Sequence, residues 1–115
     1  MVTLYGINNC DTIKKSKKWL ENNGVEFQFH DFRKDGLEKK QLASWCKELN
    51  WETLLNKRGT TWRKLPDEVK NTVTEARAIK IMLDQPAIIK RPVLDLGNKR
   101  IVGFSEDTYK TLFTT

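Results

Sequence analysis

Residues 2–30, VTLYGINNCDTIKKSKKWLENNGVEFQFH, predict a strand, a turn, a helix and a second strand in close succession. Residues 2–5 are rich in β-branched and aromatic side chains, as in a buried strand. Small or apolar residues then recur every three or four positions, which predicts the inward face of a helix over about residues 11–23. These residues are Ile13, Ser16 and Leu20. Gly24 is a favourable helix stop, and the alternation over 25–30 indicates a half-buried strand. The tight connections predict parallel strands with a right-handed crossover.

The C-terminal residues predict a second sheet unit. Residues 93–96 and 100–103 favour two strands, and Gly97-Asn98 between them is a hairpin turn signal. Ser105 can cap a final helix whose inward side chains would pack against the sheet. These side chains are Tyr109, Leu112 and Phe113. A parallel βαβ unit followed by an antiparallel ββα unit predicts an α/β fold with a four-stranded mixed sheet.

The residues between these two units, about 37–90, predict a helical insertion. A first helix is marked by an apolar face at helical spacing, formed by Leu42, Trp45, Cys46 and Leu49. Residues 51–56 extend or follow this helix, and residues 57–64, KRGTTWRK, are expected to form a basic loop. Pro66 suits the opening of a short helical turn. Thr74 can cap a later helix that ends near Pro86, and its expected inward residues are Ala76, Ile79, Met82 and Leu83.

Three features make the predicted arrangement thioredoxin-like. They are the terminal ββα unit, a cysteine (Cys10) between the first strand and the first helix, and a proline (Pro92) that opens the third strand. We therefore expect one domain over residues 1–115. Its core would comprise about residues 1–34 and 91–115, with the helical insertion between the two parts.

The composition limits the class of protein. With 38% hydrophobic residues, 31% charged residues, four Trp and five Phe, the chain is typical of an ordered globular domain. Two Cys and one His are too few for a common zinc site. No apolar run is long enough to span a bilayer and no secretory signal is visible, so we expect a soluble, cytoplasmic protein. The net charge of +6 fits either a solvated basic surface or an anionic partner: a small oxyanion, an acidic thiol such as glutathione, or nucleic acid.

Cys10 is the candidate nucleophile. It should lie at the N-terminus of the first helix, where unpaired backbone N–H groups and the helix dipole favour an anion. Lys14 and Lys15 add positive charge within the next turn, whereas the carboxylate of Asp11 opposes a thiolate slightly. The balance predicts a lowered thiol pKa and a reactive thiolate. By itself this position also allows a small buried cysteine without a chemical role.

A local dithiol is impossible in this chain. Thioredoxins and glutaredoxins often carry a second cysteine three residues after the first, and Ile13 stands at that position. Cys46, the other cysteine of the sequence, is expected to be an inert core residue on the inward face of its helix. Any catalytic cycle must therefore use an external thiol, or Cys46 as a poor internal candidate.

Three motifs carry a resemblance to a known family. Residues 3–15, with TLYG and NCDTIKK, residues 55–62, LNKRGTTW, and residues 89–93, IKRPV, resemble the ArsC-type arsenate reductase family. The combination is most similar to the YffB-like branch, which is also related to the Spx regulators. The resemblance covers essentially the whole chain and implies a thioredoxin-like fold with a helical insertion.

The family implies roles for individual residues. In its arsenate reductases the matching cysteine attacks arsenate, and glutathione or glutaredoxin reduces the adduct. The resemblance therefore implies Cys10 as the catalytic nucleophile, Arg91 as an assisting catalytic arginine, and Pro92 as the proline that is usually cis in this fold. Arsenate reductases also carry two arginines and a histidine at positions where this chain differs. Those positions are Asn56, Gly103 and Gly6.

The leading hypothesis is a glutathione-dependent thiol oxidoreductase that uses a single nucleophilic cysteine. It would bind no cofactor or metal and would take glutathione as co-substrate, with a small-molecule or protein thiol, or glutaredoxin, as the other possible partners. The residues expected to bind substrate are Asn9, Asp11, Thr12, Lys57, Arg58, Thr60 and Pro92. The alternatives are an arsenate reductase and an Spx-like adaptor that binds RNA polymerase. Direct nucleic-acid binding is disfavoured because no recognised motif accompanies the basic residues.

Overall fold

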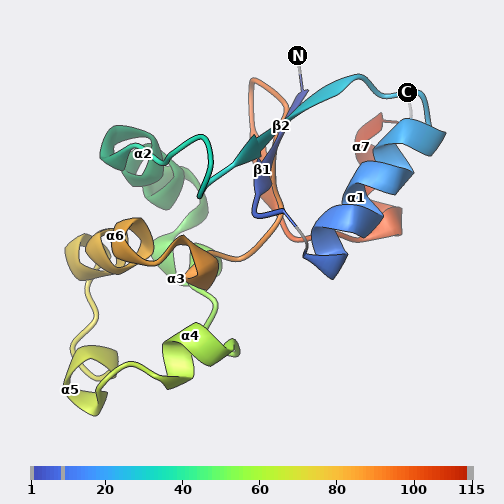
Figure 1. Ribbon diagram of the computed structural model, residues 1–115. Coiled ribbons are helices and arrows are strands. Elements are labelled where there is room, and N and C mark those ends of the chain that lie inside the picture. The colour runs from blue at the N-terminus through green and yellow to red at the C-terminus, as the bar shows by residue number, and fades with distance from the viewer. Residues whose placement is uncertain (1, 9, 114–115) are drawn as a thin grey trace. The chain divides into compact units, whose positions relative to one another are not determined.

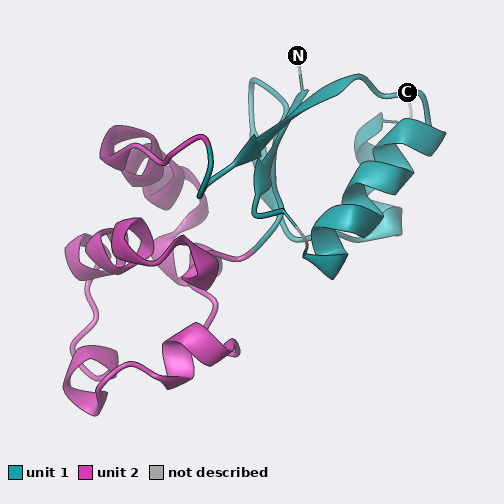
Figure 2. Ribbon diagram, in the orientation of Figure 1, with its two compact units in different colours: residues 1–34, 91–115 teal, residues 35–90 magenta. Residues whose placement is uncertain are grey.

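The structure is a computed structural model that describes residues 2–8 and 10–113 (Figure 1). The chain divides into two compact units, shown in Figure 2. The first comprises Met1–Lys34 together with Arg91–Thr115, and the second comprises Asp35–Lys90. In the part of the chain that the structure describes, no helix combines the length and apolar character that a membrane crossing requires.

The first unit is built on a mixed β-sheet. Its elements are β1 (Val2–Gly6), α1 (Asp11–Asn22), β2 (Phe27–Asp31), β3 (Val93–Asp95), β4 (Arg100–Val102) and α7 (Glu106–Phe113). Within the described residues, four strands form one sheet in the order β2-β1-β3-β4. β1 pairs in parallel with β2, whereas β1 with β3 and β3 with β4 pair antiparallel. A βαβ unit joined to a ββα unit in this order is the thioredoxin-like arrangement, which confirms the predicted fold class.

Helices α1 and α7 lie together against one face of this sheet (Figure 1). The buried cluster between them contains one residue from each of four elements, namely Leu4, Leu20, Leu94 and Tyr109. Burial of such side chains is the main term that stabilises a domain of this size. Within the cluster the hydroxyls of Ser16 and Tyr109 lie 2.8 Å apart and are hydrogen-bonded, so the one polar residue on the inward face of α1 is satisfied.

As predicted, α1 ends just before Gly24, which has a φ of +69°. Its N–H bonds to the Glu21 carbonyl, and the Val25 N–H bonds back to the Leu20 carbonyl, as in a Schellman-type helix end. This bond contradicts the prediction that Val25 belongs to the second strand. The residue alternates correctly with Phe27, but its backbone N–H closes the helix, and β2 begins at Phe27.

The second unit is helical. Its elements are α2 (Lys39–Leu49), α3 (Trp51–Leu54), α4 (Thr60–Arg63), α5 (Asp67–Lys70), α6 (Glu75–Asp84) and the 3₁₀ turn η1 (Pro86–Ile88). Asn50, with a φ of +77°, separates α2 from α3, so residues 51–56 follow the first helix and do not extend it. The expected cap of α6 is present, because Thr74 Oγ1 accepts a hydrogen bond from the Arg77 N–H at 3.3 Å.

Two details of the second unit differ from the sequence prediction. Residues 57–64 are not all loop, because Thr60–Arg63 form the short helix α4 after Gly59. Ala76 was expected to face inward on α6, but it is exposed. The buried face contains Ala78, Ile79 and Met82. At 3.6 residues per turn this face is centred away from Ala76, so a small apolar residue at the helix start was assigned to the wrong side.

Candidate active site at Cys10

Cys10 lies where the chain leaves the central strand and enters α1. β1 ends at Gly6, α1 begins at Asp11, and Cys10 is the N-cap residue with extended backbone angles, φ −94° and ψ 131°. Its carbonyl accepts the first helical hydrogen bond, from the Lys14 N–H at 3.0 Å. The thiol is partly exposed. A partly exposed cysteine at a helix N-terminus is where a thiolate is both favoured and accessible.

Arg91 and Pro92 stand at the start of β3. β1 and β3 run antiparallel with Tyr5 opposite Val93, so the beginning of β3 lies beside the end of β1, from which the Cys10 turn departs. The peptide bond between Arg91 and Pro92 is cis, as the resemblance implied, and Pro92 is buried. Its carbonyl accepts a 2.8 Å hydrogen bond from the Gly103 N–H. This pairing holds the proline segment against the end of β4.

The pKa of the Cys10 thiol is lowered. Burial alone would raise it, but the backbone N–H of Ile13, the Arg91 guanidinium and the backbone N–H of Thr12 together outweigh that effect. The Cys10 side chain does not cap α1. The consequence of the lowered pKa is a larger fraction of thiolate near neutral pH than a free cysteine would have.

The lysines of the first turn contribute less than the sequence indicated. Lys14 and Lys15 both have exposed side chains, and among the described residues the groups that lower the Cys10 pKa are the two amides and Arg91. Exposed charges are screened by solvent, whereas the helix amides point at the sulfur whatever the side chains do. Asp11 and Thr12 occupy the first turn of α1 as expected, with Asp11 exposed.

Asp31, which the sequence prediction missed, contacts the same turn. It is the last residue of β2 and lies 8% exposed. Its Oδ2 accepts a hydrogen bond from the Asn8 N–H at 3.2 Å, two residues before Cys10. Oδ1 accepts from the Arg33 N–H at 2.9 Å and the Lys34 N–H at 3.4 Å. An acidic residue closing an alternating strand was the only local signal, since the Asn8 contact joins residues 23 apart in the sequence.

Two of the positions that differ from arsenate reductases have structural explanations. A Cβ atom at Gly6 would collide with the side chain of Ile13, so a histidine could not stand there without a shift of that side chain. Gly103 has a φ of +87°, a conformation that L residues with side chains rarely adopt. An arginine at Gly103 would therefore be strained even though the space around it is open.

Lys57, Arg58 and Thr60 belong to the second unit, and their assignment to substrate binding stays a prediction. Lys57 Nζ lies 5.6 Å from the ring centroids of both Trp51 and Trp62. The Asn56 carboxamide oxygen accepts from the Arg58 N–H at 3.1 Å and shapes the turn before α4. Asn9, also predicted to bind substrate, lies outside the described residues.

Cys46 has the opposite environment to Cys10. It is 2% exposed on the inward face of α2, as predicted. Burial, and to a lesser extent the charge of Glu75, raises the pKa of its thiol to about 11. A buried thiol with a raised pKa is a poor nucleophile at neutral pH.

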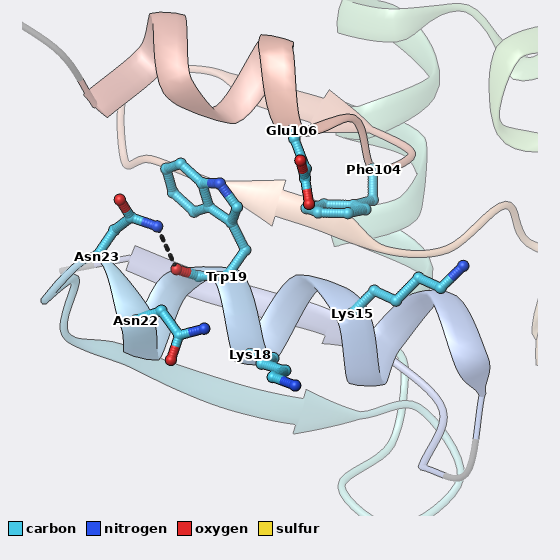
Figure 3. A pocket seen from close by; sticks show the side chains of 7 residues that line it. All are labelled: Lys15, Lys18, Trp19, Asn22, Asn23, Phe104 and Glu106. Carbon is cyan, nitrogen blue, oxygen red and sulfur yellow. Dashed lines mark hydrogen bonds between the residues drawn. The ribbon is translucent and has the colours of Figure 1, made fainter.

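The first unit also has a pocket that does not include Cys10 (Figure 3). It has a volume of about 270 Å³ and is lined by Lys15, Lys18, Trp19, Asn22, Asn23, Phe104 and Glu106. Cys10 and Arg91 are outside this lining, and the volume is below the usual range for small-molecule pockets. Among the described residues there is also no group of three or more side chains suited to hold a metal ion.

A cysteine at the start of α1, beside a cis-proline that opens β3, defines a thioredoxin-like protein with one candidate nucleophile. The chain belongs to the ArsC family, whose model matches residues 5–112. This confirms the resemblance inferred from the three motifs.

Solved structures and a curated relative agree with this membership. A protein named YffB (PA3664) is 47% identical with a TM-score of 0.92, covering 96% of this chain and 97% of that one. An arsenate reductase (ArsC) related protein from Brucella melitensis is also 47% identical, with a TM-score of 0.81 and coverage of 99% and 95%. The global transcriptional regulator Spx of Streptococcus mutans is 28% identical, covering 93% of this chain and 79% of its own.

Proposed function

We propose that this protein is a glutathione-dependent thiol oxidoreductase in which Cys10 is the single nucleophile. The observation that carries the proposal is the lowered pKa of a partly exposed Cys10 beside Arg91, in a chain whose other cysteine is buried with a raised pKa. Because Ile13 stands three residues after Cys10, the resolving thiol must come from outside. Such chemistry suits a reducing compartment such as the cytoplasm.

The reaction consists of two thiol–disulfide exchanges. The Cys10 thiolate attacks the glutathione sulfur of a mixed disulfide, an S–S bond forms between Cys10 and glutathione, and the substrate leaves as a thiolate that takes a proton. A second glutathione, as its thiolate, then attacks the glutathione sulfur on Cys10. This step restores the Cys10 thiolate and releases oxidised glutathione. The net reaction reduces the substrate sulfur to a thiol and oxidises one free glutathione, which leaves as a disulfide with the glutathione that came from the substrate.

Arg91 has two roles in this proposal. Its guanidinium stabilises the Cys10 thiolate both before attack and when it is the leaving group of the second step. The planar guanidinium can also donate two parallel hydrogen bonds to a carboxylate of glutathione, an arrangement that a lysine ammonium cannot reproduce. The first turn of α1, with Thr12 and Asp11, and the buried Pro92 segment supply the surfaces beside the sulfur.

Mass spectrometry after incubation with oxidised glutathione tests the proposal directly. The wild type should gain the mass of one glutathione on Cys10, Cys10→Ser should gain none, and Cys46→Ser should behave like the wild type. In steady-state assays with a glutathione mixed disulfide, Arg91→Lys keeps the positive charge but loses the bidentate geometry, so it should be less active than the wild type. A wild-type protein that forms no adduct and does not turn over the mixed disulfide contradicts the proposal.

Arsenate reduction is disfavoured as the activity. A tetrahedral oxyanion needs several converging donors because its charge is dense and strongly hydrated. This chain keeps Arg91, but Asn56 and Gly103 stand where arsenate reductases carry arginines. We expect little or no arsenate turnover with glutathione or glutaredoxin as reductant, and efficient turnover would reverse this ranking.

The second candidate is a regulatory adaptor similar to Spx. The match to the Streptococcus mutans regulator over most of both chains favours it. A pull-down with RNA polymerase, run in parallel on wild type and Cys10→Ser, separates the candidates. Tight polymerase binding that is indifferent to the Cys10 substitution, with no thiol turnover, would favour the adaptor.

A further inference from the structure

The carboxylate of Asp31 joins the end of β2 to the turn that carries Cys10. Asp31 is paired with Gly6 in the parallel register of β1 and β2, so it stands level with the last residue of β1. One oxygen accepts the Asn8 N–H at 3.2 Å, and the other accepts the Arg33 N–H at 2.9 Å. The side chain therefore contacts the backbone that follows β1 and the backbone that follows β2.

The carboxyl group at this position is ionised near neutral pH. Burial would raise the pKa of Asp31, but the N–H groups of Arg33, Asn8 and Lys34, with the nearby charge of Arg33, outweigh burial and lower it. Hydrogen bonds to an ionised acceptor are stronger than those between neutral groups. An anion held by backbone amides is thus a rigid connection between two loops.

Three hydrogen bonds among the described residues hold the turn between β1 and α1. The Gly6 carbonyl accepts the Phe32 N–H at 2.8 Å, Asp31 holds the Asn8 N–H, and the Cys10 carbonyl accepts the Lys14 N–H at 3.0 Å. The middle connection is the only one of these that depends on a side chain. Without it, the two remaining bonds would hold this turn at Gly6 and at Cys10.

We propose that Asp31 is a positioning residue that holds the Cys10 sulfur against the α1 amides and Arg91. The inference rests on the proposed function in that Cys10 is the nucleophile. The stabilisation of a thiolate by N–H groups and a guanidinium depends steeply on distance and direction. A direct charge effect of Asp31 would act in the opposite sense, since an anion disfavours a neighbouring thiolate. The two explanations therefore predict opposite outcomes when the charge is removed.

Alkylation of Cys10 by iodoacetamide, measured against pH, tests the inference without glutathione. All variants carry Cys46→Ser so that one thiol reports. Asp31→Asn loses an acceptor oxygen but keeps the shape of the side chain. The matched control is Glu26→Gln, which removes one acidic charge from an exposed residue shortly before β2.

We expect Asp31→Asn to raise the apparent pKa of Cys10 and to slow alkylation at pH 7 by roughly 3- to 10-fold, as misplacement of a reacting group does. Glu26→Gln should stay close to the parent. Circular dichroism establishes that each variant is folded, and if Asp31→Asn does not fold, Asp31→Ser replaces it, because its hydroxyl can still accept one amide bond. An unchanged or lowered Cys10 pKa in a folded Asp31 variant overturns the inference.

Failure of the inference and failure of the proposed function have different signatures. If wild-type Cys10 alkylates rapidly and the Asp31 variant does so equally, Asp31 has no positioning role and the proposed function stands. If the variant slows alkylation as expected but the wild type never turns over a glutathione mixed disulfide, the positioning role stands and the proposed function fails. If wild-type Cys10 reacts no faster than an unfolded-chain thiol, both are overturned.

Discussion

Tyr109→Phe removes a single hydroxyl from the interface between the helix that carries Cys10 and the last helix of the chain. Tyr109 and Ser16 are both fully buried, and their hydroxyls are 2.8 Å apart. Burial raises the pKa of Tyr109 to about 12, with the Ser16 hydrogen bond acting in the opposite direction, so the pair is neutral at ordinary pH. The phenylalanine ring would keep the edge-to-face contacts with Trp19 and Phe104. The substitution thus tests one hydrogen bond with little change in packing.

The expected cost follows from the group left behind. Tyr109→Phe leaves the Ser16 hydroxyl buried without its partner, which costs about 1–3 kcal/mol. Ser16→Ala orphans the Tyr109 hydroxyl at a similar cost. The double variant removes both hydroxyls, so it should cost about 0–1 kcal/mol, well below the sum of the single costs. For a chain of this size, 2 kcal/mol corresponds to a fall in Tm of roughly 6–12 °C.

Urea denaturation followed by tryptophan fluorescence and by circular dichroism measures all four proteins of this cycle. Trp19 reports on the interface because its ring centroid lies 5.5 Å from that of Tyr109. Each single variant should lower the midpoint at an unchanged slope, and the double variant should recover most of the loss. Single costs that add to within about 0.5 kcal/mol would refute the reasoning. The Ser16 hydroxyl would then be satisfied by a carbonyl of its own helix when Tyr109 is changed.

Three further predictions concern the core and the Cys10 turn. Cys46→Ala should lower the free energy of unfolding by about 1–2 kcal/mol through a small cavity, yet leave Cys10 labelling and turnover unchanged; lost turnover would make Cys46 a resolving thiol. Gly6→Ala should cost about 1–3 kcal/mol in urea denaturation because its Cβ would collide with Ile13. Ile13→Val in the same chain should recover part of that loss, and an unchanged midpoint for Gly6→Ala would contradict the close packing. The lowered pKa of Asp31 means that its stabilisation is present above the ordinary value of 3.8 and is lost as the pH falls through the lower folded value. Thermal unfolding over an acid pH series should therefore show a flatter dependence for Asp31→Asn, and parallel curves would count against this linkage.

The sheet and its two helices could be predicted because their signals are local. The spacing of Ile13, Ser16 and Leu20 matches the buried face of α1, and all three are buried. Gly24 and Gly97 both have the positive φ that their positions as helix stop and hairpin turn require. Such patterns depend on a few neighbouring residues, so the sequence is sufficient to identify them.

The wrong predictions concern residues whose local pattern fits two structures and does not specify which one forms. Val25 alternates like a strand residue, but its N–H is used to end α1. Ala76 has helical spacing with Ile79, but the buried face of α6 is centred on the side of Ala78. Both patterns are present in the sequence. Backbone hydrogen bonding decided the role of Val25, and packing decided which face of α6 is buried.

The candidate site was only partly accessible to sequence reasoning. The place of Cys10 at a helix start follows from the turn before α1, and the cis bond before Pro92 was implied by the family. The Asp31 contact with Asn8 was missed because it depends on the register of β1 against β2, which pairs Gly6 with Asp31. A register is a tertiary property, and one strand taken alone does not reveal it.

The pairing of β1 with β3 has a consequence for the order of events during synthesis. Thr3 pairs with Asp95, and Arg91 comes 81 residues after Cys10. A ribosome therefore completes the turn, α1 and β2 long before it supplies the strands and the arginine that belong beside them. Until then the nascent chain carries a cysteine that lacks the guanidinium, and Leu20 of its helix lacks Leu94 and Tyr109 as packing partners. The full lowering of the Cys10 pKa thus requires synthesis to reach Arg91, and a product terminated before that residue would lack one of the groups that lower it.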